Sequence, residues 1–226
     1  MRPADAYARI VRGHAQPKAR AWLDEALAWL ESGFDGPRFA VVFAAAGRRL
    51  GAEPVPLGAP ESEGFRADGL PVPDGWALDD LGRVALLRAA LVHLPESAHR
   101  AFVDELFRRG DNRERQAVLR ALPGLPDPER FAAIAVEACR TNVRPVFEAI
   151  ACHNPYPRRH FTDHHFAHLV LKALFTGVPL ATIDGLETRR TPDLVRMVGD
   201  YARERRAAGR PVPPDCALVL GKDHMP

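Results

Sequence analysis

Apolar side chains recur along most of this chain every three or four residues, and prolines or glycines separate one such run from the next. This spacing places the apolar residues on one face of an α-helix. Strands would need apolar and polar residues in alternation, and such runs are missing. Aromatic residues, which favour strands, make up only 8% of the sequence. The pattern therefore predicts an all-α protein.

The clearest helices should begin where a proline or a capping residue precedes an apolar run. Short turns between them favour antiparallel helix pairs, stacked irregularly as in HEAT-type solenoids. Because no fixed-period repeat is found, a compact helical bundle stays open as the alternative. We also expect a short helix over 178–185. The predicted starting points of the longer helices are Pro17, Pro37, Leu78, Pro95, Asp111, Asp127, Thr162 and Thr191.

A length of 226 residues suits one helical domain over 1–226. Residues 52–75 hold five prolines and four glycines and show no helical period, so they are predicted to form a long loop. This loop could cover a pocket, but a tolerated surface insertion is the favoured interpretation, and substitutions there should cost little stability. The proline-punctuated residues 211–226 should form an irregular tail.

A formal net charge of +2 gives no basic surface for nucleic acid or an anionic membrane. Three cysteines without a CxxC pair suit reduced thiols better than a disulfide framework. No apolar run approaches the length of roughly 18 residues that a membrane span needs, and the first residues lack a signal core. We therefore expect a cytoplasmic protein without a transmembrane segment and without a nucleic-acid partner.

Five of the nine histidines lie between Cys152 and Gly177. His164 and His168 are four residues apart and should meet on one helix face, with His160 just upstream. Imidazoles at this spacing suit zinc, so the three residues are candidate metal ligands. An HExxH motif is absent, however, and clustered surface histidines often only add polarity. The favoured interpretation is that the protein has no cofactor, with zinc as the alternative.

The same stretch holds two further unusual features. Prolines on both sides of Tyr156 should keep Asn154 and Tyr156 extended, so that the tyrosine ring seals the core or lines a cleft. Lys172 interrupts an apolar run, so its amine either reaches solvent or is buried with a lowered pKa. In the arginine-rich segment that follows, Arg205 and Arg206 could bind a phosphate or a carboxylate.

Four segments occur in an order that resembles the EboA family, from near Asp127 to Asp215. A departure stands at Ala167-His168, where the family favours Asn-Gln. The matching segments are Asn154-Pro155-Tyr156-Pro157, Leu171-Lys172-Ala173-Leu174-Phe175, Ile183-Asp184-Gly185-Leu186 and the run from Asp200 to Arg210.

The resemblance implies a bacterial protein whose gene clusters with those of a UbiA-like prenyltransferase, a TatD-like hydrolase, a sugar-phosphate-cyclase-like protein and a phosphodiesterase-like protein. That cluster is linked to moving secondary-metabolite precursors toward the periplasm. The expected partners are a small-molecule metabolite or other proteins of the cluster. The positions carried over as candidate ligand-binding residues are Asn154, Tyr156, Lys172, Arg205 and Arg206.

Three classes of function compete for this chain. A nucleic-acid-binding solenoid is disfavoured by the even charge. A metal-dependent hydrolase using His160, His164 and His168 is the alternative, although GxSxG, P-loop and dinucleotide motifs are all absent. The favoured hypothesis is a non-catalytic helical binding or scaffold protein, with a cleft between the 154–175 segment and the last long helix.

Overall fold

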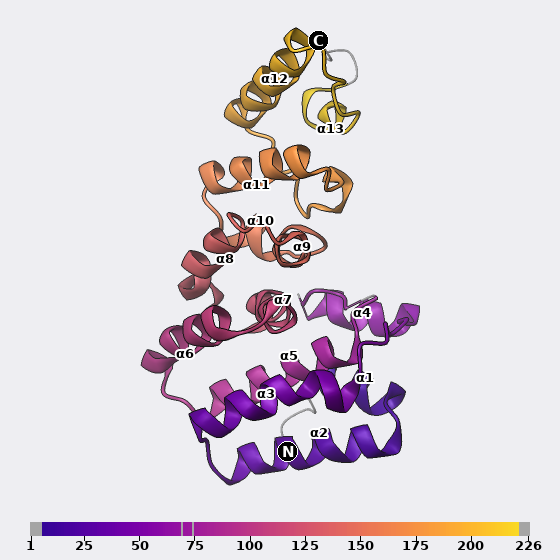
Figure 1. Ribbon diagram of the computed structural model, residues 1–226, viewed down its shortest axis with the longest axis vertical. Helices are drawn as coiled ribbons and strands as arrows, with labels where there is room; N and C mark the ends of the chain where they lie inside the picture. The colour runs from indigo at the N-terminus through magenta and orange to yellow at the C-terminus, as the bar shows by residue number, and fades with distance from the viewer. Residues whose placement is uncertain (1–5, 69, 74, 222–226) are drawn as a thin grey trace. The chain divides into compact units, whose positions relative to one another are not determined.

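The computed structural model describes residues 6–68, 70–73 and 75–221 (Figure 1). These residues form α-helices, short 3-10 turns and no β-strand, so the predicted all-α class is confirmed. Their contacts divide the chain into two compact units, unit 1 (1–134) and unit 2 (135–226). The single domain over 1–226 and the HEAT-like stacking both stay predictions, and the units are described one at a time.

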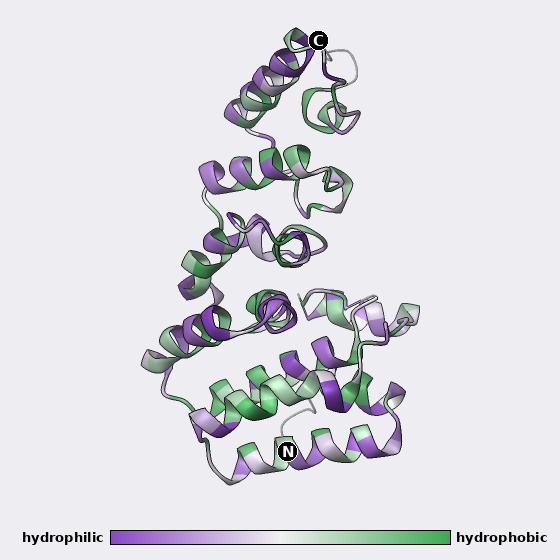
Figure 2. Cartoon of the chain, in the orientation of Figure 1, coloured by the Kyte–Doolittle hydropathy of each residue, from purple (hydrophilic) through white to green (hydrophobic). Residues whose placement is uncertain are grey.

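Unit 1 is built around one central helix. The helix α5 contacts α1, α2, α3 and α7, and its residues are buried almost all round from Leu78 to Leu87. Figure 2 shows the middle of α3 as a strongly apolar stretch, which supplies Phe39 and Phe43 to the same core. The helices and turns of unit 1 are α1 (Ala6–His14), α2 (Pro17–Ser32), α3 (Gly36–Leu50), α4 (Ala59–Ala67), α5 (Leu78–Val92), α6 (Glu96–Arg109), α7 (Asn112–Ala121), η1 (Leu122–Gly124) and η2 (Pro128–Phe131).

The loop predicted over 52–75 needs a correction, because it contains helix α4. The carboxylate of Glu61 accepts a hydrogen bond from the Gly58 amide at 2.9 Å and so closes the first turn. Phe65 is buried and packs its ring on Tyr7, with 4.9 Å between ring centroids. The period was missed because α4 is short and buries one large side chain rather than an apolar stripe. Residues 69 and 74 of this stretch lie outside the described residues.

The unit boundary falls within α8 (Ala132–Ala138), and unit 2 contains the remaining helices. The helix α11 contacts α9 and α12, and α12 contacts α13, so the helices follow one another as successive tiers within this unit (Figure 1). They are α9 (Arg144–Ala151), α10 (Tyr156–His160), α11 (Asp163–Thr176), η3 (Leu180–Thr182), α12 (Pro192–Ala207) and α13 (Cys216–Leu220).

The predicted ends of α7, α11 and α12 coincide with hydrogen-bonded caps. Asp111 accepts hydrogen bonds from the amides of Arg113 and Glu114, and the Glu114 carboxylate accepts one in return. The hydroxyls of Thr162 and Thr191 each accept a bond from an amide three residues later, at 3.2 Å. Local sequence therefore sets these boundaries without help from distant contacts.

Two expectations near the end of the chain differ from the structure. The segment 178–185 forms only the 3-10 turn η3, and the Leu180 amide at its start donates to the Asp215 carboxylate at 2.7 Å. The tail predicted over 211–226 contains helix α13, which buries Cys216, Val219 and Leu220 against α12. Residues 222–226 of this tail lie outside the described residues.

Candidate functional site

The turn that precedes α10 is a structural element of unit 2. Asn154 is buried; its side-chain amide donates to the Ala149 carbonyl at 2.9 Å, and its carbonyl oxygen accepts from the Tyr156 amide at 3.0 Å. Both groups of this side chain hold the backbone of the turn. Asn154 is thus placed to shape the chain rather than to present its amide to a ligand.

Tyr156 seals the core, one of the two roles considered for it. Its side chain is 0% exposed, and its ring contacts the rings of His160 and Phe161 at centroid distances of 4.7 and 6.3 Å. The expected extended backbone is wrong at this position, because Tyr156 is the first residue of α10. Burial of the ring outweighs the preference for extended geometry before Pro157.

The three candidate metal ligands are not brought together. The rings of His164 and His168 meet on the exposed face of α11, with 4.3 Å between centroids, whereas the His160 ring packs on Tyr156. In the part of the chain that the structure describes, no group of three or more histidine, cysteine, aspartate or glutamate side chains is arranged to hold a metal ion. The geometry therefore provides one histidine pair, two ligands short of a tetrahedral zinc site.

We expect this pair to bind zinc weakly, because two ligands leave half of the coordination shell to water. Metal analysis of purified, untagged protein after dialysis should find zinc far below one equivalent. His164→Ala and His168→Ala should change that content no more than the control His165→Ala does. Near-stoichiometric zinc that both variants lose and the control keeps would instead revive the metal-dependent hydrolase.

Lys172 is half-buried and turns back onto unit 2. Its Nζ donates to the Thr141 carbonyl and lies 5.2 Å from the centroid of the Phe147 ring. Burial is the main cause that lowers the pKa of this amine. Lys172 therefore matches neither alternative fully, because it is half-buried and its amine reaches a carbonyl acceptor rather than open solvent.

The two candidate arginines on α12 have different surroundings. Arg205 donates from Nε to the Pro211 carbonyl at 2.7 Å, and its guanidinium lies 5.7 Å from the centroid of the Tyr201 ring. Arg206 is exposed. The five predicted ligand-binding residues therefore do not form one cluster, since Asn154 and Tyr156 are buried and Lys172 and Arg205 bond to backbone carbonyls.

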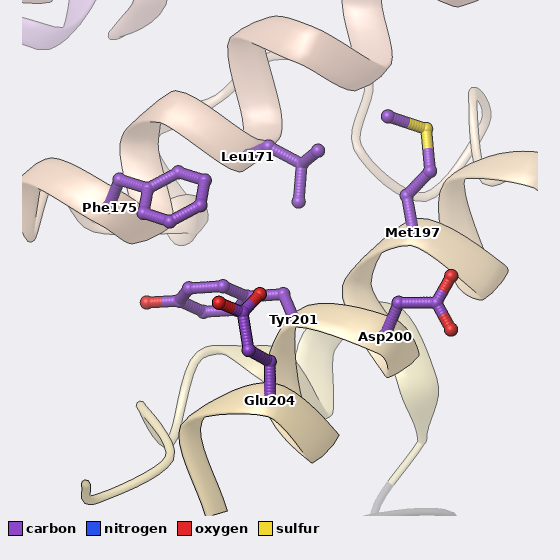
Figure 3. A pocket seen from close by; sticks show the side chains of 6 residues that line it. All are labelled: Leu171, Phe175, Met197, Asp200, Tyr201 and Glu204. Carbon is purple, nitrogen blue, oxygen red and sulfur yellow. The ribbon is translucent and has the colours of Figure 1, made fainter. Parts of the chain in front are cut away.

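A groove nevertheless lies where the sequence predicts a cleft, between α11 and α12 (Figure 3). Its volume is about 220 Å³. Phe175 stands at its edge, 66% exposed, and its ring meets the Tyr201 ring edge-on at 4.7 Å. None of the five candidate residues lines it. The lining side chains are Leu171, Phe175, Met197, Asp200, Tyr201 and Glu204, and we call this set the α11–α12 groove.

The register of α11 explains the exposure of Phe175 and could have revealed it. Phe166, Leu169, Val170, Ala173 and Leu174 form the buried face. Phe175 follows this face by one position, so the helix turns its ring away from the core. The position of Phe175, one residue past the buried face, was therefore the available sequence signal for its exposure.

Arg189 joins several segments of unit 2. Its guanidinium donates to the carbonyls of Arg158 and Phe161 at 2.8 and 3.0 Å and to the Asp163 carboxylate at 2.6 Å. It also lies 5.0 Å from the centroid of the Phe166 ring. One side chain thereby holds the end of α10 against the start of α11.

Replacing Arg189 by alanine should destabilise unit 2 by about 1–3 kcal/mol, because the part-buried Phe161 carbonyl loses its donor and the Phe166 ring loses its guanidinium contact. Arg189→Lys should recover little, since an ammonium cannot span the same acceptors as a planar guanidinium. Thermal unfolding followed by circular dichroism measures both changes, and Arg206→Ala, on the exposed surface, is the control. A variant as stable as this control would contradict the assignment.

Unit 1 contains a buried charge cluster that the sequence analysis did not single out. Asp79 pairs with Arg83 at 2.5 Å and with Arg113 through both carboxylate oxygens, and Asp80 pairs with Arg120. Burial would raise the pKa of the Asp79 carboxyl, but hydrogen bonds from Arg113 and Arg83 outweigh it, so that pKa lies below its ordinary value. The sequence signal for this cluster was available: Asp79 and Asp80, with Arg83 four residues after Asp79, lie within an otherwise apolar helix.

The fold and the groove together define an all-α protein with an apolar surface recess. The model of one family, described as metabolite traffic protein EboA, matches residues 4–220. The chain therefore belongs to the EboA family, as the resemblance indicated. No curated protein and no solved structure matches it significantly. Within the described ranges, no helix combines the length and the apolar character of a membrane span.

Proposed function

We propose that this EboA-family chain is a non-catalytic binding or scaffold protein that assists the traffic of a secondary-metabolite precursor toward the periplasm. It acts in the cytoplasm and binds either the small-molecule metabolite or another protein encoded in its gene cluster. Membership of a metabolite-traffic family over residues 4–220 supports the general role.

The observation that carries the proposal is the α11–α12 groove. Phe175 exposes two thirds of its surface although it contacts Tyr201, so an apolar ring is held at the surface of unit 2. Figure 2 colours much of α12 as hydrophilic, and the sequence of this helix contains Asp193, Arg196, Asp200, Arg203, Glu204, Arg205 and Arg206. An apolar recess within a charged surface is typical of a site that another molecule covers.

The chemistry of the three cysteines supports binding rather than nucleophilic catalysis. Burial raises the pKa of the Cys139 thiol to about 12 and also raises the pKa values of Cys152 and Cys216. All three thiols therefore stay protonated at neutral pH, whereas a catalytic cysteine must form a thiolate.

The proposal is tested by comparing what wild type and Phe175→Ser retain from cells that express the whole gene cluster. Val41→Ser is the matched control, because Val41 is 69% exposed on α3, outside the groove. We expect Phe175→Ser to lose a cluster protein or a metabolite that wild type and the control keep. Identical retention by all three proteins would exclude the groove, and product formation by wild type alone would favour an enzyme.

A further inference from the structure

We infer that the α11–α12 groove binds an amphipathic helix of a partner protein, through one apolar side chain and a lysine or arginine about one helical turn away. This inference rests on the proposed function and selects one of its two ligand classes. It depends on the size of the groove, the charges on its wall and the arrangement of its lining residues.

The groove is smaller than a usual small-molecule site. Its volume of about 220 Å³ lies below the range of roughly 300–1,000 Å³ that is usual for small-molecule sites. Leu171 and Phe175 on one wall, and Met197 and Tyr201 on the other, are pairs four residues apart. The α11 wall therefore extends one helical turn, about 6 Å, and the α12 wall, from Met197 to Glu204, extends about two turns. A recess of this length fits a single bulky side chain whose backbone stays outside.

The charge of the lining selects a basic occupant. Asp200 and Glu204 both stand on the α12 wall, opposite the apolar side chains of α11 (Figure 3), and no lining residue is basic. Asp200 shares its carboxylate with Arg196 and Arg203 in exposed pairs. Across the described residues, no ion pair engages the Glu204 carboxylate. Glu204 is thus the acceptor that an incoming cation would meet.

The spacing of these groups matches a helix. Both walls of the groove are helices, and the two carboxylates are themselves one helical turn apart. A partner helix presents residues at positions i and i+4 on one face, so one face can supply both the apolar anchor and the basic group. Phe175 is already held edge-on against Tyr201 and would pack beside that anchor, as aromatic hot-spot residues do.

The test uses a display library of helical peptides with randomised surface positions, selected on the immobilised full-length chain. Counter-selection on Phe175→Ser removes peptides that bind elsewhere. We expect enriched peptides to carry an apolar residue with lysine or arginine three or four positions away. Their affinity should fall about tenfold on Phe175→Ser. No enrichment over the counter-target, or enrichment without a basic residue, would overturn the inference.

A charge exchange then tests the contact with Glu204. Glu204→Lys should weaken an enriched peptide several-fold, whereas the exposed control Glu187→Lys should not. Replacing the basic residue of the peptide by glutamate should restore binding to Glu204→Lys and abolish it on wild type. Failure of this exchange to restore binding would contradict the predicted orientation.

The other occupants give distinct results. A dimer in sedimentation analysis that Phe175→Ser dissociates would assign the groove to a second copy of this chain and overturn the inference. Loss of a cell-derived metabolite on Phe175→Ser, without any helical peptide selected, would overturn it too but leave the proposed function standing. If the cellular retention of the three proteins is identical, the proposed function itself fails.

Discussion

Replacing Asp79 by asparagine is expected to lower the free energy of unfolding by about 3–5 kcal/mol, the usual cost of removing one partner from a buried ion pair. Asp79 is 0% exposed and Arg83 is 2% exposed. The amide would leave Arg83 with its bond to the Phe43 carbonyl at 3.1 Å but without an anion. Arg113 would keep at most one of its two bonds to this side chain, because the amide NH₂ of asparagine cannot accept.

Tryptophan fluorescence during urea unfolding measures this loss, because Trp22, Trp29 and Trp76 all lie in the unit that contains Asp79. The matched control is Asp24→Asn in the same unit. Asp24 pairs with Arg12 at 2.7 Å, but both side chains are partly exposed, so the change should cost less than about 1 kcal/mol. Equal losses in the free energy of unfolding for the two variants would contradict the assignment of Asp79 to a buried ion pair.

The loss should also depend on pH, since the pKa of Asp79 is lowered in the folded chain. A lowered folded pKa adds stability above the unfolded pKa of about 3.9, and that stability is lost as the pH falls toward the folded value. The difference in the free energy of unfolding between wild type and Asp79→Asn should therefore be largest near pH 7 and should decrease below about pH 4. A gap that stays constant to pH 3 would show that the carboxyl does not titrate in this way.

Local sequence was sufficient for most of the helices. Thr162 and Gly177 bound α11 as predicted, with Gly177 at a φ of 68°, a left-handed conformation that glycine adopts without strain. The α5 helix shows what local sequence patterns do not predict. Its apolar period places the core, but the partners of Asp79 and Asp80 come from α7, 34 and 40 residues away. Periodicity carries no information on which distant arginines approach a buried acid.

The sequence predicted the place of the groove better than it predicted the residues that line it. The order of the segments that resemble the EboA family drew attention to the α11 and α12 region, and a groove is present there. The residues chosen for it were polar or cationic, whereas the groove has an apolar floor and an acidic wall. Tyr156 illustrates the reason: its sequence neighbours left open whether the ring seals the core or lines a cleft, and packing on Phe161 and His160 buries it completely. The direction of a side chain depends on tertiary packing that spacing alone does not define.

Replacing Phe65 by alanine should also cost about 3–5 kcal/mol, comparable to Phe131→Ala, although a sequence-based loop would predict almost no loss. Both side chains are buried, Phe65 at 3% and Phe131 at 0% exposed. The Phe65 ring packs on Tyr7, and the Tyr7 ring stacks on Trp76 at 6.0 Å, so the truncation opens space inside an aromatic cluster.

Hydrogen bonds at both ends of the 52–75 segment hold it in place. They should prevent α4 from moving to fill the cavity that Phe65→Ala leaves. The Val55 amide donates to the Trp76 carbonyl at 2.9 Å, and the Leu78 amide donates to the Glu53 carbonyl at 3.2 Å. Urea unfolding followed by tryptophan fluorescence measures the cost, with Glu63→Ala on the exposed side of α4 as the control. If the free energy of unfolding of Phe65→Ala lay within about 0.5 kcal/mol of that control, α4 would contribute little to the stability of unit 1. A loss that matches Phe131→Ala would make the proline-rich segment part of the core of unit 1.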